Sequence, residues 1–544
     1  MQDHNHILAL PSSKLLVSGV ACGYFVHQYV KRVEVDRHPL SILSIVVAAP
    51  FVLAFGLRHL GKYEGYLLAY QSALMVESCA VLSLWMNTLI YRAFSHPLKE
   101  FPGPFGAKLS KFWSLKQVID SKVRWYQVVG ELKNKYGDYV RTGPRELVIF
   151  DPEAIVPILG FNSKTRKGPF YGAMEQSLHT TRDHDFHKMR RKVWDLAFKQ
   201  TLADYGPSIE EFTDSLLARV ASSGGKPLAL NDLCIHYSYD VMSALAFGDS
   251  TRFLEGKSTK TATKILDNIR EGIVAVGALL HVPWILTVVE SISFAGPMME
   301  FNRWSAEQVD KRSQMKNPRP DIMGHLLEHT EDTAAGRRLL NADSRVIIGA
   351  GSDTTASALT VLFVLLATNP SYQKKLRDEV EIIFANSTYN SAKPQVLLDG
   401  IINEALRLYP PVTFLSQRVT PAEGLTIGKV HIPPDTVVSV GTFSIHHDAR
   451  NFLRPDEFIP ERWSSQPDLI LNKSAFIPFS VGAYNCPGRG LAMMELRSVI
   501  SRTVQEFDIS TSDMHEFDTR GFFDGIKDHF TSGVPRCEMV FQKR

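Results

Sequence analysis

The sequence Phe479-Ser-Val-Gly482-Ala-Tyr484-Asn-Cys486-Pro487-Gly488-Arg-Gly490-Leu-Ala492 places one cysteine in a loop of glycine and proline residues. A helical pattern from Leu491 to Val499 follows at once. We expect Pro487 to be the first helical residue, which puts Cys486 near the N-cap. Free backbone N–H groups and the helix dipole at that position favour a thiolate. The glycines leave room for a flat ligand, although a lone cysteine in such a loop is more often a half-buried structural thiol.

A second unusual segment, Ala350-Gly351-Ser352-Asp353-Thr354-Thr355, lies inside a long helical pattern from about 343 to 367. Its Gly, Ser, Asp and Thr residues are poor helix formers. Apolar residues flank the segment on both sides, at 346–348 and 359–366. We therefore expect one continuous helix with a local distortion, in which a threonine hydroxyl competes for a backbone carbonyl group. A break in the helix is the alternative.

Glu404 and Arg407 are spaced i, i+3 on a helical segment that ends at Pro410-Pro411. This spacing puts the two side chains on one helix face, within pairing distance. Apolar neighbours at 401, 402, 405, 406 and 408 indicate burial, where an unpaired charge is costly. Surface helices also contain many such pairs, so this spacing alone does not identify a site.

A basic run, Phe186-His-Lys-Met-Arg-Arg-Lys192, contains His187 and Arg191 at spacing i, i+4. Residues at this spacing share one helix face. A solvated basic face is the simplest interpretation of the run, and we assign Arg190 and Lys192 to it.

These four patterns together resemble the cytochrome P-450 family. The cysteine loop is similar to the family's haem-binding signature, Phe-x-x-Gly-x-Arg-x-Cys-x-Gly-x-x-x-Ala, with Tyr484 in place of the arginine. The long helix carries the family's Ala-Gly-x-Asp-Thr-Thr motif. The resemblance implies a mainly α fold with small β-sheets. It also implies a haem-binding catalytic domain, residues 101–544. The apolar stretches described below predict a membrane segment with two to three transmembrane helices, residues 1–100, before this domain.

The resemblance implies haem b as cofactor, with Cys486 as the axial thiolate ligand of its iron and as the metal ligand of the protein. It places Phe479 and Gly482 in the haem-binding loop. Thr354 is assigned to dioxygen activation and Asp353 to proton delivery, because oxygen–oxygen cleavage needs protons at controlled positions in a dry pocket.

The resemblance also implies which carboxylates the basic residues bind. Haem propionates are expected at His187, Arg191 and Arg418. Since Tyr484 cannot neutralise a carboxylate, Arg191 and Arg418 have to carry more of this binding. Arg462, from Phe458-Ile-Pro-Glu-Arg-Trp463, is expected to join Glu404 and Arg407 in a structural trio that holds the cysteine loop in place.

Three apolar stretches, 15–30, 40–57 and 66–91, occupy the first hundred residues. At about 1.5 Å per residue, the second nearly crosses a hydrocarbon core of about 30 Å. No Lys or Arg occurs in residues 1–13, which argues against a signal peptide. The segment 101–106, Phe-Pro-Gly-Pro-Phe-Gly, resembles the hinge that follows the anchor in microsomal members.

The placement of positive charge predicts the orientation of this segment. Three spans put the N-terminus in the lumen of the endoplasmic reticulum and the large domain in the cytosol. Arg58 and Lys62 weaken this orientation without reversing it. The residues that support it lie between the first two stretches or after the last, namely Lys31, Arg32, Arg37, Lys99, Lys108 and Lys111.

The bulk composition narrows the class of protein. The chain has 544 residues, 44% of them hydrophobic, and a net charge of +3, which gives no sign of nucleic-acid binding. Its five cysteines are odd in number and form no CxxC pair, so a disulfide framework or zinc site is not indicated. Alternating stretches at 138–150 and 425–440 predict strands in an otherwise helix-rich domain.

The resemblance implies a monooxygenase that inserts one oxygen atom of O2 into a hydrophobic small molecule, such as a fungal secondary metabolite, and reduces the other to water. No flavin or nucleotide motif is evident, so electrons from NADPH are expected to arrive through a separate NADPH–cytochrome P-450 reductase. Arg489, Arg497 and Arg502 could form its basic docking surface, or could be ordinary surface arginines. The substrate pocket is expected near Tyr171, Ile348, Thr413–Leu415 and His529–Phe530.

Three other functions remain open from the sequence. The first is a haem-thiolate enzyme for oxidative coupling, ring formation or isomerisation. The second is a non-catalytic haem-binding membrane protein, and the third is a membrane scaffold without haem. Two glycosylation sequons, at Asn386 and Asn472, are expected to stay unmodified on a cytosolic domain.

Overall fold

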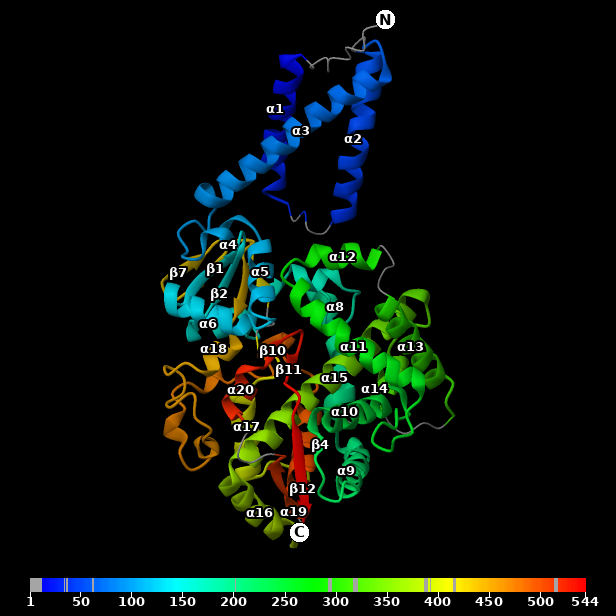
Figure 1. The fold of residues 1–544 in the computed structure, drawn as a ribbon, viewed down its shortest axis with the longest axis vertical. Helices are drawn as coiled ribbons and strands as arrows, with labels where there is room; N and C mark the ends of the chain where they lie inside the picture. Colours follow the sequence, from blue (N-terminus) through cyan, green and yellow to red (C-terminus); the bar gives the residue numbers. More distant parts are fainter. Residues whose placement is uncertain are drawn as a thin grey trace, which may run out of the picture.

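The computed structural model divides into an N-terminal bundle of long helices and a larger body of helices and small sheets (Figure 1). The C-terminus lies at the end of the body farthest from the bundle (Figure 1). The predicted mainly α fold with small β-sheets is confirmed. The structure describes residues 12–33, 35, 38–60, 63–200, 202–291, 296–316, 321–385, 390–391, 393–413, 417–512 and 517–544.

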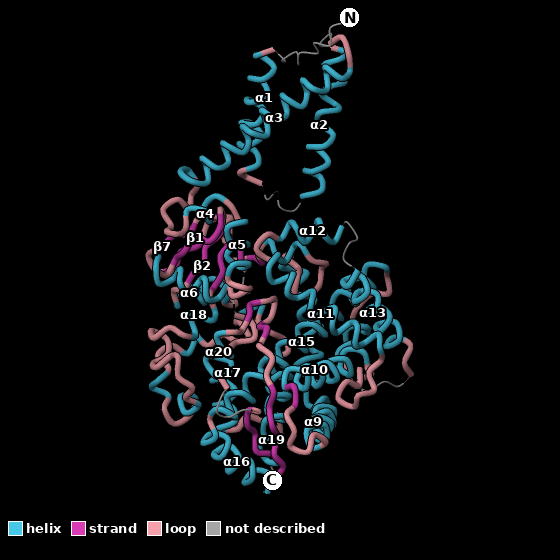
Figure 2. The backbone as a smooth tube through the Cα atoms, viewed as in Figure 1, coloured by secondary structure: helices cyan, strands magenta, loops and turns pink. Residues whose placement is uncertain are grey.

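Helices supply most of the body and lie mainly on one side of it, whereas the largest sheet lies on the other (Figure 2). The longer helices are α6 (Trp125–Tyr136), α8 (His184–Asp195), α9 (Gly206–Ala221), α10 (Leu230–Phe247), α11 (Lys260–Leu279), α13 (Gly296–Ser313), α15 (Ala334–Thr368), α16 (Pro370–Ala385), α17 (Val396–Leu408) and α19 (Arg489–Glu506). The shorter ones are α4 (Phe105–Leu109), α5 (Phe112–Asp120), α7 (Ile155–Leu159), α12 (Pro283–Ser291), α14 (Ile322–Glu328), α18 (Thr442–His446) and α20 (Thr519–Asp524).

The described strands form one five-stranded sheet and three smaller ones. In the large sheet the order is β1-β2-β8-β5-β3, and only the β2–β8 pair is parallel. Both stretches predicted as strands are confirmed. The strands are β1 (Tyr139–Gly143), β2 (Glu146–Ile149), β3 (Arg166–Lys167), β4 (Leu228–Ala229), β5 (Arg418–Val419), β6 (Leu425–Ile427), β7 (Val430–Ile432), β8 (Val437–Val440), β9 (Phe507–Thr511), β10 (Lys527–Asp528), β11 (Ser532–Gly533) and β12 (Glu538–Lys543).

The N-terminal bundle consists of α1 (Ser13–Val30), α2 (Pro39–His59) and α3 (Tyr66–Ile90). Three described helices are long and apolar enough to cross a membrane, namely α2, α3 with its extension to Ser95, and α15. In α15, 78% of the apolar window is buried, against 17% in each of the other two, so α15 is a core helix of the body. The predicted first span, 15–30, is helical but does not reach the same apolarity.

Small residues let α1 pack closely along α3. A Cβ atom on Gly23 would lie 2.1 Å from the carbonyl oxygen of Ala80, and one on Gly19 would lie 2.5 Å from that of Val76. A hydrogen bond also joins the two helices, since Ser83 Oγ on α3 donates to the Val20 carbonyl on α1 at 2.8 Å. The Gly19-x-x-x-Gly23 spacing is typical of helix pairs inside membranes.

Substituting Gly23 with valine is expected to separate α1 from α3, because the new side chain would overlap the Ala80 backbone. The expected destabilisation is about 1–3 kcal/mol, the usual range for overpacking. The thermal unfolding midpoint of the detergent-solubilised chain measures it. Gly56→Val is the matched control, since a Cβ there meets nothing within 4 Å. Equal midpoints for the two variants would contradict this packing.

The segment after α3 is fastened to the large sheet. The Arg141 side chain on β1 is fully buried, and it donates to the carbonyl oxygens of Arg92 at 3.1 Å and Pro144 at 2.7 Å. The Arg141 backbone N–H donates to the Pro102 carbonyl at 2.7 Å. The predicted hinge at 101–106 is therefore hydrogen-bonded to β1 in this structure.

Candidate functional site

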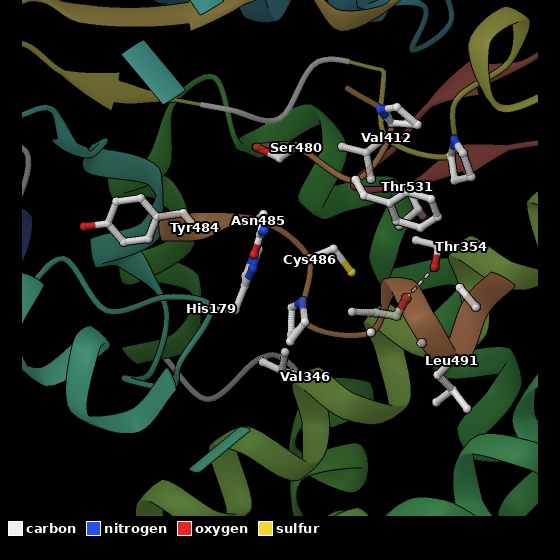
Figure 3. A pocket seen from close by; sticks show the side chains of 18 of the residues that line it. His179, Val346, Thr354, Val412, Ser480, Tyr484, Asn485, Cys486, Leu491 and Thr531 are labelled. Atoms are coloured by element: carbon white, nitrogen blue, oxygen red, sulfur yellow. Dashed lines mark hydrogen bonds between the residues drawn. The ribbon is translucent and has the colours of Figure 1, made fainter. Parts of the chain in front are cut away.

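A cavity of about 270 Å³ lies in the body between the cysteine loop with α19 on one side and α15 on the other. Figure 3 shows the Cys486 sulfur directed into this space and the Tyr484 ring directed away from the sulfur, although both residues line the cavity. Its walls are mostly apolar. Residues that line it include Val346, Ala350, Thr354, Thr355 and Ala358 from α15, Phe479, Cys486, Gly488 and Leu491 from the cysteine segment, and Lys167, His187, Arg191 and Arg418 at one edge.

The cysteine loop delivers the sulfur just before α19. The helix begins at Arg489 with Gly488 as N-cap, so the prediction of Pro487 as first helical residue is wrong by two positions. The Cys486 backbone N–H donates to the Phe479 carbonyl at 2.9 Å and closes the loop. Burial raises the pKa of the Cys486 thiol, while the N–H groups of Gly488 and Arg489 and the positive charge of Arg191 oppose this rise. The helix N-terminus thus favours the thiolate, as expected, but burial outweighs it.

Gly482 supports the loop from behind and does not itself line the cavity. Its φ of +75° lies in the left-handed region, and a Cβ atom would come within 2.0 Å of the Leu159 carbonyl oxygen. Only glycine fits both conditions. Phe479 does line the cavity, and the guanidinium of Arg489 lies over its ring at 5.8 Å.

The helix α15 runs without a break through the Ala350–Thr355 motif, so the alternative of a helix break is wrong. The predicted competition for a carbonyl group is confirmed, because Thr354 Oγ1 donates to the Ala350 carbonyl at 2.7 Å (Figure 3). Thr354 and Thr355 both line the cavity.

Asp353 faces the other side of α15. It lines a second, more polar cavity of about 480 Å³, together with Asn231, Arg270, Lys527 and His529. Burial raises the pKa of Asp353 to about 7, and the charge of Arg270 acts in the opposite direction. The carboxyl group is therefore poised to gain or lose a proton near neutral pH.

The three residues of the predicted structural trio are in contact. The Glu404 carboxylate accepts from Arg407 at 2.9 and 3.0 Å and from Arg462 at 2.8 Å. It also accepts from the Trp463 indole at 2.9 Å. All three charged side chains are fully buried.

A residue that the sequence analysis missed, His446, connects this trio to the cysteine loop. Burial lowers the His446 pKa to about 3, so the ring is neutral. Its Nδ1 lies 3.0 Å from the Arg407 carbonyl and its Nε2 accepts from the Ile477 backbone N–H at 3.0 Å. Ile477 lies two residues before Phe479, where the loop begins. No local pattern distinguishes His446 from other histidines, because its partners are distant in sequence.

One edge of the cavity collects positive side chains. Arg418 is buried, and its Nε has no hydrogen-bond partner in the described structure. Arg191 is committed to the loop, since it donates to the Asn485 carbonyl at 2.8 Å, the Asn485 side chain at 2.7 Å and Asp195 at 2.8 Å. His187 is buried beside the Tyr484 ring at 4.4 Å, and burial lowers its pKa to about 3.

Lys167 lies at the same edge, and the sequence analysis missed it too. The side chain is buried and lines the cavity. Its ammonium group donates to the carbonyl oxygens of Leu178 at 3.1 Å and His179 at 2.5 Å. Burial, together with the charges of Arg418 and Arg191, keeps the Lys167 pKa well below its usual range. The pairing of β3 with β5 places Lys167 at this edge of the cavity, beside Arg418.

Two expectations for basic residues are wrong. Arg190 is not part of a solvated face, because it is buried and donates to Asp343 on α15 at 2.7 Å. Arg497 is neither a docking residue nor an ordinary surface arginine, since it is buried and donates to Asp399 at 2.7 and 2.9 Å. Lys192 is exposed, as expected, and so is Arg489.

The expected substrate-pocket segments are partly confirmed. Tyr171 and Phe530 line the cavity, but Ile348 lies in the core. His529 lines the second cavity, and Thr413 is buried and donates to Asp528 at 2.6 Å. Phe414 and Leu415 lie outside the described residues, as does the Asn386 sequon. The Asn472 side chain donates to the Asn451 side chain at 3.0 Å, so its amide nitrogen is engaged.

The cavity fits a haem group. Its walls are apolar, a thiol faces into it, and one edge carries Lys167 and Arg418, neither of which pairs with a carboxylate among the residues that the structure describes. A flat apolar ring with two carboxylates at one edge complements these features.

Comparison with known proteins agrees with this geometry. A sequence model of the family described as cytochrome P-450 matches residues 102–523. The chain is 34% identical to the cytochrome P-450 monooxygenase FCK2 of Fusarium pseudograminearum, over 96% of each chain. It is 34% identical to the cytochrome P-450 monooxygenase nodW of Hypoxylon pulicicidum, over 97% of this chain and 98% of that one. Tryprostatin B 6-hydroxylase of Neosartorya fischeri is 32% identical, over 85% and 86%. The chain therefore belongs to the cytochrome P-450 family of haem-thiolate monooxygenases.

Proposed function

We propose that the chain hydroxylates a hydrophobic secondary metabolite, with haem b held in the cavity by the Cys486 thiolate. The observation that carries this proposal is the pairing of one cavity-facing thiol with an uncompensated cationic edge. The relatives support the reaction class, since one of them is named as a hydroxylase. The mostly apolar lining favours an apolar substrate.

Haem, when bound, supplies dioxygen activation and oxygen insertion. The residues of the chain have the remaining tasks. Arg418 would hold a propionate, His187 and Arg191 line the same edge, and Phe479 lines the cavity on the cysteine side. Thr354 presents a hydroxyl oxygen to the cavity while its own proton is held by the Ala350 carbonyl, so it can accept a hydrogen bond there.

Asp353 supplies protons from the opposite face of α15. Its raised pKa keeps the carboxyl group partly protonated at neutral pH, and the polar cavity beside it offers a route for replacement protons from solvent. The apolar wall on the Thr354 side keeps water away from the substrate. Proton supply and substrate binding are thereby separated by one helix.

The electron donor we propose is a membrane-bound NADPH–cytochrome P-450 reductase. Exposed basic residues near the cysteine loop support docking of an acidic partner. They are Lys188, Lys192 and Lys199, on or just after α8, and Arg489.

We further propose that residues 1–100 form a three-span anchor and that the domain 101–544 faces the cytosol from the endoplasmic reticulum membrane. The apolarity of α2 and α3 and the close packing of α1 along α3 support this arrangement. The C-terminal end of α1 lies on the side nearest the body (Figure 1), and Lys31 and Arg32 follow it in the sequence, in agreement with the positive-inside rule.

One experiment tests the reaction and separates it from the alternatives. Membranes that contain the chain and a reductase are supplied with NADPH and an extract of fungal metabolites, and products are followed by mass spectrometry. A product heavier by one oxygen atom supports hydroxylation. A product that has lost two hydrogens indicates coupling or ring formation, and a haem spectrum without turnover indicates a non-catalytic haem protein.

Substituting Asp353 with asparagine is expected to lower turnover and to raise stability above neutral pH. Between pH 3.8 and about 7 the unfolded aspartate has lost its proton while the folded one keeps it, so the folding stability of the wild type falls as pH rises through this window. The asparagine variant lacks this loss, which amounts to at most about 4 kcal/mol. Thermal midpoints at pH 5 and pH 8 measure the difference. The exposed Asp267, replaced by asparagine, is the control, and parallel pH profiles for wild type and Asp353→Asn would count against the assignment.

A further inference from the structure

The cationic edge of the cavity contains an unusual pair. Lys167 on β3 and Arg418 on β5 are direct cross-strand partners in an antiparallel pair, and both side chains are buried. Like charges directly opposite each other destabilise a sheet, and burial makes this cost larger. Neither residue has a carboxylate partner in the part of the chain that the structure describes. Because burial and the charge of Arg418 keep the Lys167 pKa well below its usual range, an anion bound at this edge would favour the charged form of Lys167 and would pair with Arg418. The described part of the chain supplies no such anion.

Tyr484, in the cysteine loop, lies against both of these side chains. Its ring centroid is 4.9 Å from the Lys167 ammonium and 4.9 Å from the Arg418 guanidinium. Both distances are within the range of a cation–π contact. An arginine at position 484, as in the family signature, would add a third positive charge at the same spot. The tyrosine instead stabilises the two cations that are present.

We infer that Lys167 takes over the anion-binding task that the signature arginine would have at position 484, and that it binds a haem propionate together with Arg418. This inference rests on the proposed haem site. The edge then carries as many basic residues as the family signature would give it. One of them is on β3, at position 167, and not in the cysteine loop, at position 484.

The surroundings of Lys167 fit this role. An ammonium group has three N–H donors, and two of them are used by the carbonyl oxygens of Leu178 and His179. The third is left for a carboxylate. The two carbonyl contacts and the Tyr484 ring fix the position of the ammonium group, so little side-chain entropy remains to be lost when an anion binds.

Four variants of the full-length holoprotein test the inference: Lys167→Met, Tyr484→Arg, the double variant Lys167→Met/Tyr484→Arg, and Arg166→Met. Arg166 is the exposed neighbour on the same strand, so its loss removes one positive charge away from the cavity. Haem loss is followed by transfer to an excess of apomyoglobin, and the propionate bending bands are recorded by resonance Raman spectroscopy.

We expect Lys167→Met to speed haem transfer about tenfold to a hundredfold, the range for one charge-assisted hydrogen bond. The propionate bands should shift in Lys167→Met and stay unchanged in Arg166→Met. Tyr484→Arg alone should not slow haem loss, because it places a third cation beside Lys167. The double variant should recover most of the wild-type retention.

Equal transfer rates for Lys167→Met and Arg166→Met would overturn the inference, and so would a double variant that loses haem as fast as Lys167→Met. If Lys167→Met yields no holoprotein, the double variant decides, since recovery of holoprotein supports the inference and continued absence refutes it. A wild type without a thiolate-type haem spectrum would instead refute the proposed function. The two failures are therefore distinct.

Discussion

Replacing Cys486 with serine is expected to abolish the thiolate-type haem spectrum and all turnover, which is the largest effect we predict. A serine hydroxyl is not ionised near neutral pH and does not replace a thiolate as ligand to haem iron. The loop itself should survive the change, because its closing bond joins the backbone N–H of residue 486 to the Phe479 carbonyl and does not involve the sulfur. The loss should therefore be chemical and should leave the fold intact.

The measurements are the spectrum of the reduced, carbon monoxide-treated protein and NADPH-dependent product formation. Cys537→Ser is the matched control, because Cys537 is half-buried and lies away from the cavity. Circular dichroism should show the same helix content in both variants. A Cys486→Ser protein that kept the wild-type spectrum and turnover would refute the haem assignment.

Replacing Glu404 with glutamine is expected to have the second-largest effect, on folding and haem loading together. The substitution keeps the shape but removes the only carboxylate that contacts both Arg407 and Arg462 in the described structure, so two buried guanidinium groups lose their counter-charge. Breaking a buried pair in this way costs about 3–5 kcal/mol. Because total stability is typically about 5–15 kcal/mol, this cost is a large fraction of it.

The yield of haem-loaded protein and the thermal midpoint of whatever remains measure this effect. Glu131→Gln, on the exposed side of α6, removes the same charge without a buried partner and should be neutral. Loss of the His446 contact to Ile477 should accompany the Glu404 change, so the Soret band should also broaden as the cysteine loop loosens. Normal yield and an unchanged midpoint would show that the trio does not hold the loop.

The sequence predicted the parts of the molecule that depend on neighbouring residues. The helical pattern around 343–367 correctly predicted a continuous helix, although the segment contains poor helix formers. Apolar residues on both sides of that segment bury the helix. The spacing of Glu404 and Arg407 gave a buried pair for the same reason. Three N-terminal helices followed from apolar length alone.

Pairings across long sequence distances could not be predicted. Arg190 and Arg497 read as surface residues because nothing near them in sequence shows Asp343 or Asp399 as a buried partner. Lys167 was missed, since a two-residue strand has too short a pattern to be recognised. The start of α19 was misplaced because Pro487 and Gly488 are both acceptable at a helix beginning.

The Arg141 contacts have a mechanical consequence for the whole molecule. They fasten the chain leaving α3 to the sheet, and α12 packs against α2 at a second point, so two separate attachments join the bundle to the body. Because the body is held at two points, it cannot pivot freely about a single linker. The two attachments therefore fix the tilt of the body against the bundle, and in the membrane arrangement that we propose they also hold the cysteine loop at one height and angle above the bilayer.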